Sequence, residues 1–460
     1  MRKEKLDVIA EYEKVRGESK EMVNLVVIGH VDSGKSTLMG HLLFKLGNVS
    51  QKMMHKHEKE SRKVGKQSFM YAWVLDETDE ERERGITMDV GQNKFETDKK
   101  LITLLDAPGH RDFIPNMISG AYQADVGVLV VNATTGEFEA GFEAGGQTRE
   151  HALLVRSLGV NQLVVAVNKL DTVEWSKDRF DTIANKMKLF LTKQAGFKES
   201  DLTFLPCSGL TGENLVKGPE NQTLTSWYSG PSLVEAIDRL RPPDRAMDKP
   251  FRLSIADIFK GQAAGFSVAG RVESGFVTKD DKVLISPLNE VGVVKSVVVD
   301  CVPGWQGFAG DHVTIGMVGP DITSLAPGMV LSDPANPVTV TARFQARIVV
   351  FNIDVPITKG NFEQAEVITL DSLGYPVVMH YGCVSEQATV RKLVSLLHKT
   401  TGEVVKAKPR VLTGNCSAVV ELNVSKPIPV ELYRTNRELG RFMLRTGGHT
   451  IAAGMITELL

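Results

Sequence analysis

The first half of the chain contains largely apolar runs, each followed by a polar or glycine-containing turn. The runs at 24–28, 101–105, 126–131 and 163–167 do not alternate regularly between apolar and polar residues. Continuous hydrophobicity is typical of strands that are covered on both faces, and hence of a parallel sheet wrapped by helices. The pattern therefore predicts a doubly wound α/β domain with a mostly parallel sheet, which we place at 23–243.

The second half of the chain has a different pattern. Short runs rich in β-branched residues alternate with turns that contain Gly, Pro, Asn and Asp, as in β-barrels or sandwiches. Prolines interrupt the chain at 241–244 and again at 333–337. We therefore expect two all-β domains, each a barrel or a sandwich, at 248–335 and 338–460. The first 22 residues are strongly charged and are expected to form a solvated helix or linker.

Composition excludes several classes of protein. The chain has 460 residues, a formal net charge of −2 and four cysteines without a C-x-x-C pair. The near-neutral charge gives no global attraction to nucleic acid or membrane, so any RNA contact depends on local patches. The cysteine spacing argues against a zinc knuckle or a disulfide framework. Without a signal-like or membrane-spanning apolar run, the sequence predicts a cytoplasmic protein.

The segment GHVDSGKS follows the first apolar run and precedes a helix-like stretch. Strand, glycine loop and helix is the order that a phosphate site requires, because backbone N–H groups and the positive helix end converge on one point. Lys35 should reach the β- and γ-phosphates, and the Ser36 hydroxyl should bind Mg²⁺. The candidate phosphate-binding residues are Gly29, His30, Val31, Asp32, Ser33, Gly34, Lys35, Ser36 and Thr37.

Two later loops could detect a γ-phosphate. The charged stretch 76–87 looks like a mobile loop, and Thr87 at its end is the candidate that completes Mg²⁺ coordination. Asp106 follows a buried strand, where a carboxylate faces the ligand crevice and can hold Mg²⁺ through a water. Gly109 can bring its N–H against the γ-phosphate. His110 follows where an attacking water would lie, so Thr87, Gly109 and His110 are the catalytic candidates.

The tetrapeptide NKLD ends another buried strand and gives base selection. The Asp171 carboxylate can accept hydrogen bonds from N1–H and the 2-amino group of guanine, and Asn168 can contact N7 and O6. Two charge-assisted hydrogen bonds of roughly 1.5–3 kcal/mol each favour guanine by about two to four orders of magnitude. The candidate base-site residues are Asn168, Lys169, Asp171 and, through backbone N–H groups, Ser208, Gly209 and Leu210.

Together GHVDSGKS, ERERGIT, DAPGH and NKLD resemble the translational GTPases that carry tRNA-like cargo to the ribosome. The similarity covers nearly the whole chain from about Val23. The segments 136–160 and 438–459 look most like the ribosome-rescue members that partner Pelota. This resemblance implies a P-loop GTPase domain and two β-barrels that grip cargo. It further implies GTP, GDP and Mg²⁺ as cofactors, and delivery of a Pelota-type protein to stalled ribosomes in no-go and non-stop mRNA surveillance.

The same resemblance implies a monomer that forms a heterodimer with its cargo and meets ribosomal RNA near the GTPase-activating centre. Its residue roles fall on Lys35 and Ser36 for phosphate and Mg²⁺, Thr87 for switch closure, Asp106 and Gly109 for γ-phosphate sensing, His110 for the water, and Asn168 and Asp171 for guanine. The sequence departs from the family in two places: the usual long N-terminal extension is not part of it, and it inserts residues 361–374, expected to form a surface hairpin.

Three other functions remain open from the sequence. An elongation factor carrying aminoacyl-tRNA and a release-factor GTPase belong to the same class. A GTP-binding scaffold without catalysis is a different class, against which the intact set of Thr87, Asp106, Gly109 and His110 argues. A regulatory GTPase subunit, as in sulfate activation, would require an ATP-sulfurylase partner.

Overall fold

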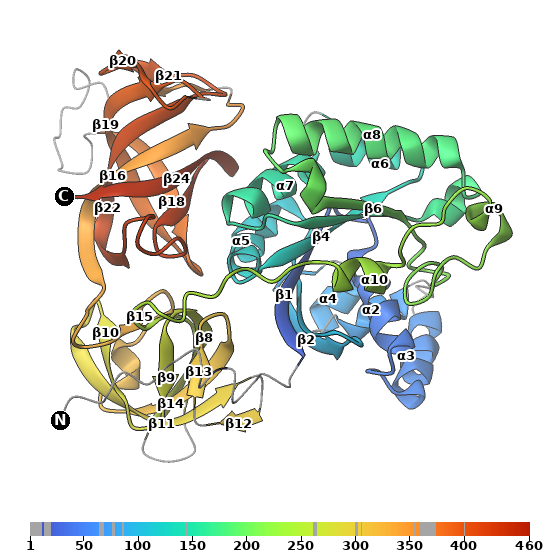
Figure 1. Cartoon of the computed structure of the whole chain (residues 1–460), viewed down its shortest axis with the longest axis horizontal. Helices are drawn as coiled ribbons and strands as arrows, with labels where there is room; N and C mark the ends of the chain where they lie inside the picture. Colours follow the sequence, from blue (N-terminus) through green and yellow to red (C-terminus); the bar gives the residue numbers. More distant parts are fainter. Residues whose placement is uncertain are drawn as a thin grey trace. The chain divides into compact units, whose positions relative to one another are not determined.

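The computed structural model describes residues 12, 20–63, 69–75, 79–84, 87–143, 146–260, 265–299, 302–304, 306–353, 355–358, 374–399 and 401–460. The chain forms two compact units, which divide after Pro243 (Figure 1). The expected hairpin at 361–374, apart from Gly374, and most of the expected N-terminal linker lie outside the described residues.

The unit that precedes residue 244 contains a six-stranded sheet in the order β2-β3-β1-β4-β5-β6. The strands are β1 (Glu21–Ile28), β2 (Gly91–Glu96), β3 (Lys100–Asp106), β4 (Val126–Asn132), β5 (Leu163–Asn168) and β6 (Leu202–Pro206). Edge strand β2 pairs antiparallel with β3, and the other neighbouring strands pair in parallel. The expected doubly wound, mostly parallel sheet is confirmed.

Helices cover both faces of this sheet. They are α2 (Lys35–Lys45), α3 (Gln51–Lys63), α4 (Asp79–Arg84), α5 (Ile114–Tyr122), α6 (Glu137–Phe142), α7 (Gln147–Ser157), α8 (Lys177–Lys193), α9 (Gln222–Thr225) and α10 (Leu233–Asp238), with 3-10 turns η2 (Ala72–Val74), η3 (Arg111–Phe113), η4 (Leu170–Val173) and η5 (Glu199–Asp201). Leu25 and Val27 of β1 pack with Leu42 of α2 and Ile237 of α10. Helices α5 to α8 lie on the opposite side of the sheet (Figure 1). Burial on both faces explains why β1 and β5 are almost entirely apolar.

The parallel strands carry the candidate site residues to one edge of the sheet. The phosphate loop follows β1, Asp106 is the last residue of β3, and Asn168 is the last residue of β5. Carboxyl ends of parallel strands meet at the same edge, where open α/β sheets bind ligands. Gly34, immediately before α2, has a φ of 84°, a backbone conformation that residues with a Cβ rarely adopt.

The other unit contains two closed sheets. The first has the order β10-β15-β7-β8-β14-β11-β12, and pairing of β10 with β11 closes it. The second has the order β18-β23-β24-β16-β22-β19-β20, and β18 closes it by pairing with β19. Such closure removes the exposed sheet edges, and the two expected β-barrels are confirmed.

The strands of the first barrel are β7 (Arg252–Lys260), β8 (Phe266–Ser274), β10 (Lys282–Ser286), β11 (Glu290–Val299), β12 (Val302–Gly304), β14 (His312–Val318) and β15 (Val330–Ser332), with the added pair β9 (Phe276–Thr278) and β13 (Gln306–Phe308) and the turn η6 (Ile322–Ser324). The strands of the second barrel are β16 (Thr339–Val350), β18 (Tyr375–Tyr381), β19 (Val384–Leu397), β20 (Val404–Ala407), β22 (Ser417–Val430), β23 (Arg441–Thr446) and β24 (His449–Leu459), with the added pair β17 (Ile357–Thr358) and β21 (Val411–Leu412).

A buried ion pair connects the two barrels. The Arg252 guanidinium of β7 lies 2.7 Å from the Glu431 carboxylate, and their side chains are 3% and 12% exposed. Arg252 also donates to the carbonyl of Asn336 in the connecting segment. Because removing one partner would leave a buried charge unpaired, this contact fixes the barrels to each other.

Candidate functional site

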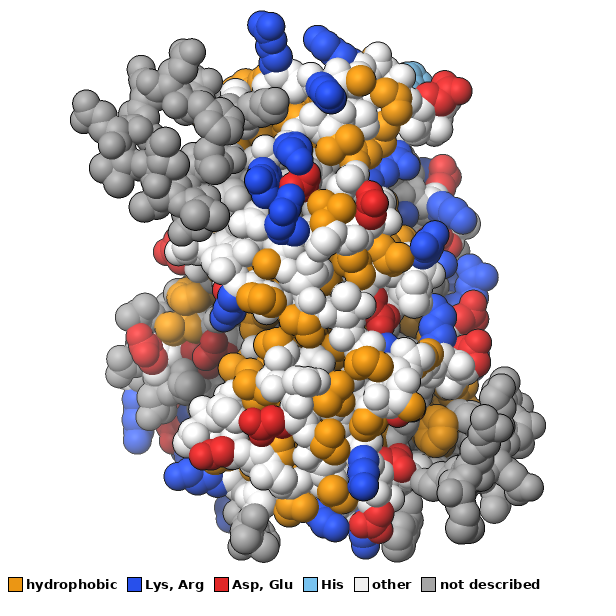
Figure 2. Space-filling model, turned by 90° about the vertical axis from the view of Figure 1, so that its left-hand side faces the viewer, with side chains coloured by type: hydrophobic (Ala, Val, Ile, Leu, Met, Phe, Trp, Pro, Cys, Tyr) orange, Lys and Arg blue, Asp and Glu red, His pale blue; other side chains and the backbone are white. Residues whose placement is uncertain are grey.

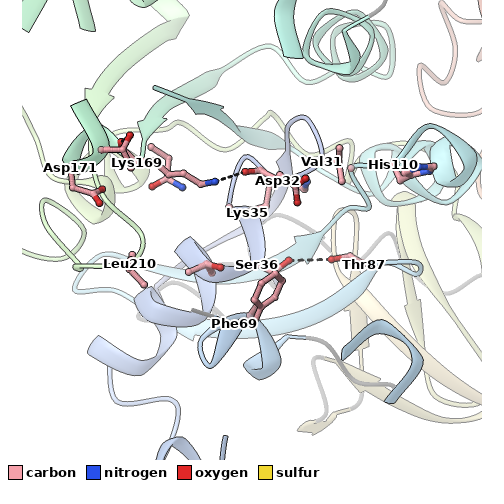
Figure 3. Close-up of a pocket in the computed structure, with 16 residues that line it drawn as sticks. Val31, Asp32, Lys35, Ser36, Phe69, Thr87, His110, Lys169, Asp171 and Leu210 are labelled. Carbon is pink, nitrogen blue, oxygen red and sulfur yellow. Dashed lines mark hydrogen bonds between the residues drawn. The ribbon is translucent and has the colours of Figure 1, made fainter. Parts of the chain in front are cut away.

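A cavity of about 400 Å³ opens at the carboxyl edge of the six-stranded sheet (Figure 3). Its lining consists of Val31, Asp32, Gly34, Lys35, Ser36, Thr37, Phe69, Ala72, Thr87, Gly109, His110, Asn168, Lys169, Asp171, Thr172 and Leu210. Volumes of this order suit a small-molecule ligand or cofactor. The structure thus brings most of the sequence-predicted residues, from five separate stretches of chain, around one cavity.

Some predicted residues lie outside this lining. They are Gly29, His30, Ser33, Asp106, Ser208 and Gly209. Several support residues that do face the cavity. Lys35 donates to the carbonyl oxygens of Gly29 at 3.1 Å and His30 at 3.2 Å, which holds the ammonium against the loop. Burial lowers the pKa of the Lys35 ammonium, so an anionic ligand here would offset the cost of burying its charge.

The Gly109 backbone passes close to the phosphate loop. A Cβ added to Gly109 would lie 2.3 Å from Lys35 Nζ and 3.0 Å from the Gly29 carbonyl oxygen. A side chain at this position would therefore displace the Lys35 ammonium or separate the two loops. The close approach explains why a glycine suits this position, next to the lysine that would bind phosphate.

Three oxygen-bearing side chains meet at the start of α2. The Ser36 hydroxyl donates to Asp106 Oδ2 at 2.8 Å and lies 3.1 Å from the Thr87 hydroxyl. Burial raises the pKa of the Asp106 carboxyl to about 6, against the opposing effects of Lys35 and Ser36. Asp106 Oδ1 is buried and has no hydrogen-bond partner within the described part of the chain. Hard oxygen donors and an unsatisfied carboxylate oxygen fit Mg²⁺.

The far end of the cavity carries the NKLD residues. Asp171 Oδ1 is buried and has no hydrogen-bond partner among the residues that the structure describes. A carboxylate oxygen in this state is suited to accept from a ligand N–H group, as guanine recognition requires. Lys169 Nζ donates to the Asp32 carbonyl at 2.8 Å and so lies across the phosphate loop.

The Asn168 side chain lines the cavity and also forms hydrogen bonds to two loops of the protein. Its Nδ2 donates to the Ser33 carbonyl at 2.9 Å, and its Oδ1 accepts from the Gly209 N–H at 2.8 Å. The Asn168 Nδ2 carries two hydrogens, so one of them remains available for a hydrogen bond to a nucleotide base. The Ser208 N–H donates to the Glu213 carbonyl. The N–H groups of Ser208 and Gly209 thus have partners inside the protein, and of these three residues Leu210 lines the cavity, so base contact through this loop stays a prediction.

His110 lies at the opposite end of the cavity from Asp171 (Figure 3). It begins the short turn η3, and its Nδ1 accepts from the Asp112 N–H at 3.3 Å. Its side chain is 40% exposed. A ligand that placed its base against Asp171 would extend its terminal phosphate toward Ser36 and His110.

Sequence reasoning missed Phe69, Ala72, Thr172 and Gln147. With its amide nitrogen toward the two acceptors, buried Gln147 donates to the Gly109 carbonyl and to His30 Nδ1, each at 2.7 Å, and accepts from the Arg111 N–H at 2.8 Å. Gln147 thus ties the phosphate loop to the loop that carries His110. A glutamine at the start of a helix gives no sequence signal for this role. The apolar stretch that contains Phe69 and Ala72, set among charged residues, could have indicated a buried segment.

Comparisons with known proteins agree with this geometry. Residues 20–243 match the family model for the elongation factor Tu GTP binding domain, and residues 343–457 match the model described as GTP-eEF1A C-terminal domain-like. Elongation factor 1-alpha of Thermofilum pendens is 42% identical over 442 residues, which are 96% of this chain and 98% of that protein.

Protein HBS1 of Drosophila melanogaster is 58% identical over 448 residues, which are 97% of this chain. The chain spans 65% of the length of that relative. Among solved structures, the GTPase-like domain of S. cerevisiae Ski7 bound to GTP superposes with a TM-score of 0.78 at 19% identity, covering 98% of this chain and 99% of that one. This likeness concerns the fold alone.

Proposed function

This chain belongs to the translational GTPases, and from that membership we propose that it is a GTP-hydrolysing ribosome-rescue factor that delivers a Pelota-type partner to the A site of stalled ribosomes. The observation that supports GTP hydrolysis is the arrangement around one cavity. At one end lies Asp171, whose buried Oδ1 has no hydrogen-bond partner in the part of the chain that the structure describes, and Lys35, Ser36 and His110 lie toward the other end.

The proposed reaction is attack of water on the γ-phosphate of GTP. Lys35 binds the β- and γ-phosphates, and Ser36, Thr87 and Asp106 hold the metal site. When bound, Mg²⁺ neutralises charge that develops on the phosphate oxygens. The Gly109 N–H contacts the γ-phosphate, and His110 orients the water. Positioning and charge stabilisation supply nearly all the catalysis in such reactions, so hydrolysis by the isolated chain should be slow.

The rescue role is supported by the 58% identity with Protein HBS1, compared with 42% for elongation factor 1-alpha of Thermofilum pendens. The segments 136–160 and 438–459 point to the same subgroup. We further propose a cytoplasmic monomer that forms a heterodimer with its cargo, and domain boundaries near 243–248 and 335–338. Among the described residues, no helix has the length and apolarity needed to cross a membrane.

The second barrel offers a charged face for a partner. Lysine and arginine side chains gather over this barrel (Figure 2). Glu421 is surrounded there by Arg343 at 2.8 Å, Lys392 at 2.8 Å and Arg391 at 4.0 Å. Because one carboxylate neutralises only part of three positive charges, the cluster stays basic. It could therefore contact an acidic partner surface or ribosomal RNA.

Single-turnover GTP hydrolysis on ribosomes with an empty A site would test the proposed function. The reaction would be compared after addition of Pelota, aminoacyl-tRNA or the stop-codon release factor. Stimulation by Pelota alone supports the rescue role. Stimulation by charged tRNA or by the release factor would retain the GTPase and move the chain to a neighbouring subgroup, and no stimulation by any cargo would favour a GTP-binding scaffold.

A further inference from the structure

One wall of the nucleotide cavity comes from a segment outside the four recognised motifs. Ala72, the first residue of the turn η2, and Phe69, which precedes this turn, line the cavity together with residues of the phosphate loop and the base loop. Phe69 is half-buried. In the view of Figure 3 its ring lies between Leu210 on one side and Thr87 on the other. Most of the residues that line the cavity have polar or charged side chains, so the presence of a phenylalanine ring requires an explanation.

The segment that carries Phe69 is firmly attached to α2. The Tyr71 ring stacks on the His41 imidazole with 3.9 Å between ring centroids and 5° between ring planes. Trp73 is buried and Leu75 belongs to the hydrophobic core. A Cβ added to Gly40 would lie 1.9 Å from the Tyr71 carbonyl oxygen, so the segment's backbone touches the helix directly. Its packing therefore fixes where Phe69 stands.

The same helix also fixes the base loop and the phosphate loop. His41 Nδ1 lies 2.8 Å from the carbonyl oxygen of Gly209, in the base loop. Ser36 and Thr37 form the first turn of this helix. Phe69 is thus held at a set position relative to both ends of the cavity, as a preorganised ligand contact requires.

We propose that the Phe69 ring packs against the ribose and α-phosphate portion of bound guanine nucleotide and slows its release; this inference rests on the proposed GTP binding. In the view of Figure 3 the ring lies between Leu210, assigned to the base, and Thr87, assigned to the terminal phosphates, and all three residues line the cavity. A ribose presents apolar C–H groups, which an aromatic face can shield from water. The contact does not involve the γ-phosphate, so GDP and GTP should benefit equally.

The test compares Phe69→Ala with the wild-type chain in calorimetric titrations with unlabelled GDP and GTP. Unlabelled nucleotides are necessary, because a fluorescent group on the ribose would disturb the contact under test. We expect the Kd to rise about tenfold for both nucleotides, mainly through faster dissociation. Phe69→Leu keeps apolar volume without the ring and should give a smaller rise. Phe259→Ala removes a 46% exposed phenylalanine of β7 and should leave both Kd values unchanged.

Circular dichroism and thermal unfolding would establish that each variant is folded. If Phe69→Ala does not fold, Phe69→Leu decides the question. A folded Phe69→Ala variant whose Kd for GDP stays within about twofold of the wild-type value would overturn the proposal, because the proposal expects that Kd to rise about tenfold. Weaker binding of GTP alone would also overturn it, because the ring would then act on the γ-phosphate side. A wild-type chain that binds neither nucleotide would instead refute the proposed function.

Discussion

Replacing Asn168 with alanine should separate the phosphate loop from the base loop. The Asn168 amide donates to the Ser33 carbonyl and accepts from the Gly209 N–H, and all three groups are buried. Alanine removes both hydrogen bonds and leaves a buried carbonyl and a buried N–H without partners. The perturbation therefore acts on two loops that are 135 and 41 residues from Asn168 along the chain.

The expected magnitude follows from these two orphaned groups. Each unsatisfied buried polar group costs about 1–3 kcal/mol, so the unit that contains β5 should lose about 3 kcal/mol of unfolding free energy. The nucleotide would lose its contact with the Asn168 side chain. The two loops that bind it would also be held less rigidly. We expect GDP to bind about a hundredfold more weakly, which corresponds to about 3 kcal/mol.

Asn132→Ala is the matched control. Asn132 pairs with Asn168 in the register of β4 and β5, is also buried, and accepts one local hydrogen bond from the Thr134 N–H at 3.0 Å. Urea unfolding followed by tryptophan fluorescence and GDP titration would measure both variants. The reasoning is refuted if Asn168→Ala loses no more unfolding free energy than Asn132→Ala and binds GDP as the wild type does.

Three further outcomes are expected. His110→Ala should bind GDP and GTP normally but lose ribosome-stimulated hydrolysis by about a hundredfold or more; wild-type single-turnover rates would remove His110 from the mechanism. Asp171→Asn exchanges an acceptor for a donor, so affinity should move from GTP toward XTP in competition titrations, and unchanged preference would contradict guanine recognition by Asp171. Burial lowers the pKa of His151 to about 3 and of His380 to about 4. Below about pH 6.5 these histidines therefore bind protons in the unfolded chain but stay neutral in the folded chain. The free energy of unfolding, which has its full value above that pH, should fall by about 1–2 kcal/mol per histidine by pH 5. The fall should be smaller in the His380→Gln variant.

Much of the fold followed from the sequence because its physical causes are local. Strands buried on both faces require continuous apolar runs, which made β1 and β5 recognisable. The glycine loop before α2 and the polar residues at strand ends then placed the cavity, because parallel strands end at one edge. The alternation of short strands and turns predicted two β-domains but not the closure of the first into a barrel, which the pairing of β10 with β11 makes.

Other parts of the site depend on contacts between distant segments. Gln147 joins His30 to Gly109 through hydrogen bonds that no spacing along the chain encodes. Phe69 enters the cavity because Tyr71, two residues later, stacks on His41. The sequence shows the donors, acceptors and rings in each case. Which of them meet is determined only when the helices pack on the sheet.

The two ends of the cavity differ in how firmly they are built, and this difference bears on regulation. At the base end, Asn168, Gly209 and His41 form a continuous buried chain of hydrogen bonds. At the other end, Gln147 anchors the backbone on both sides of His110, but the His110 side chain is 40% exposed and contacts its own turn, and Thr87 meets Ser36 through one hydroxyl contact of 3.1 Å. A rigid base end would bind nucleotide without help, whereas a partly exposed His110 side chain would leave the water poorly oriented. Activation by the ribosome would then consist of fixing the His110 side chain, and it would raise the rate of hydrolysis without changing how the base end binds nucleotide.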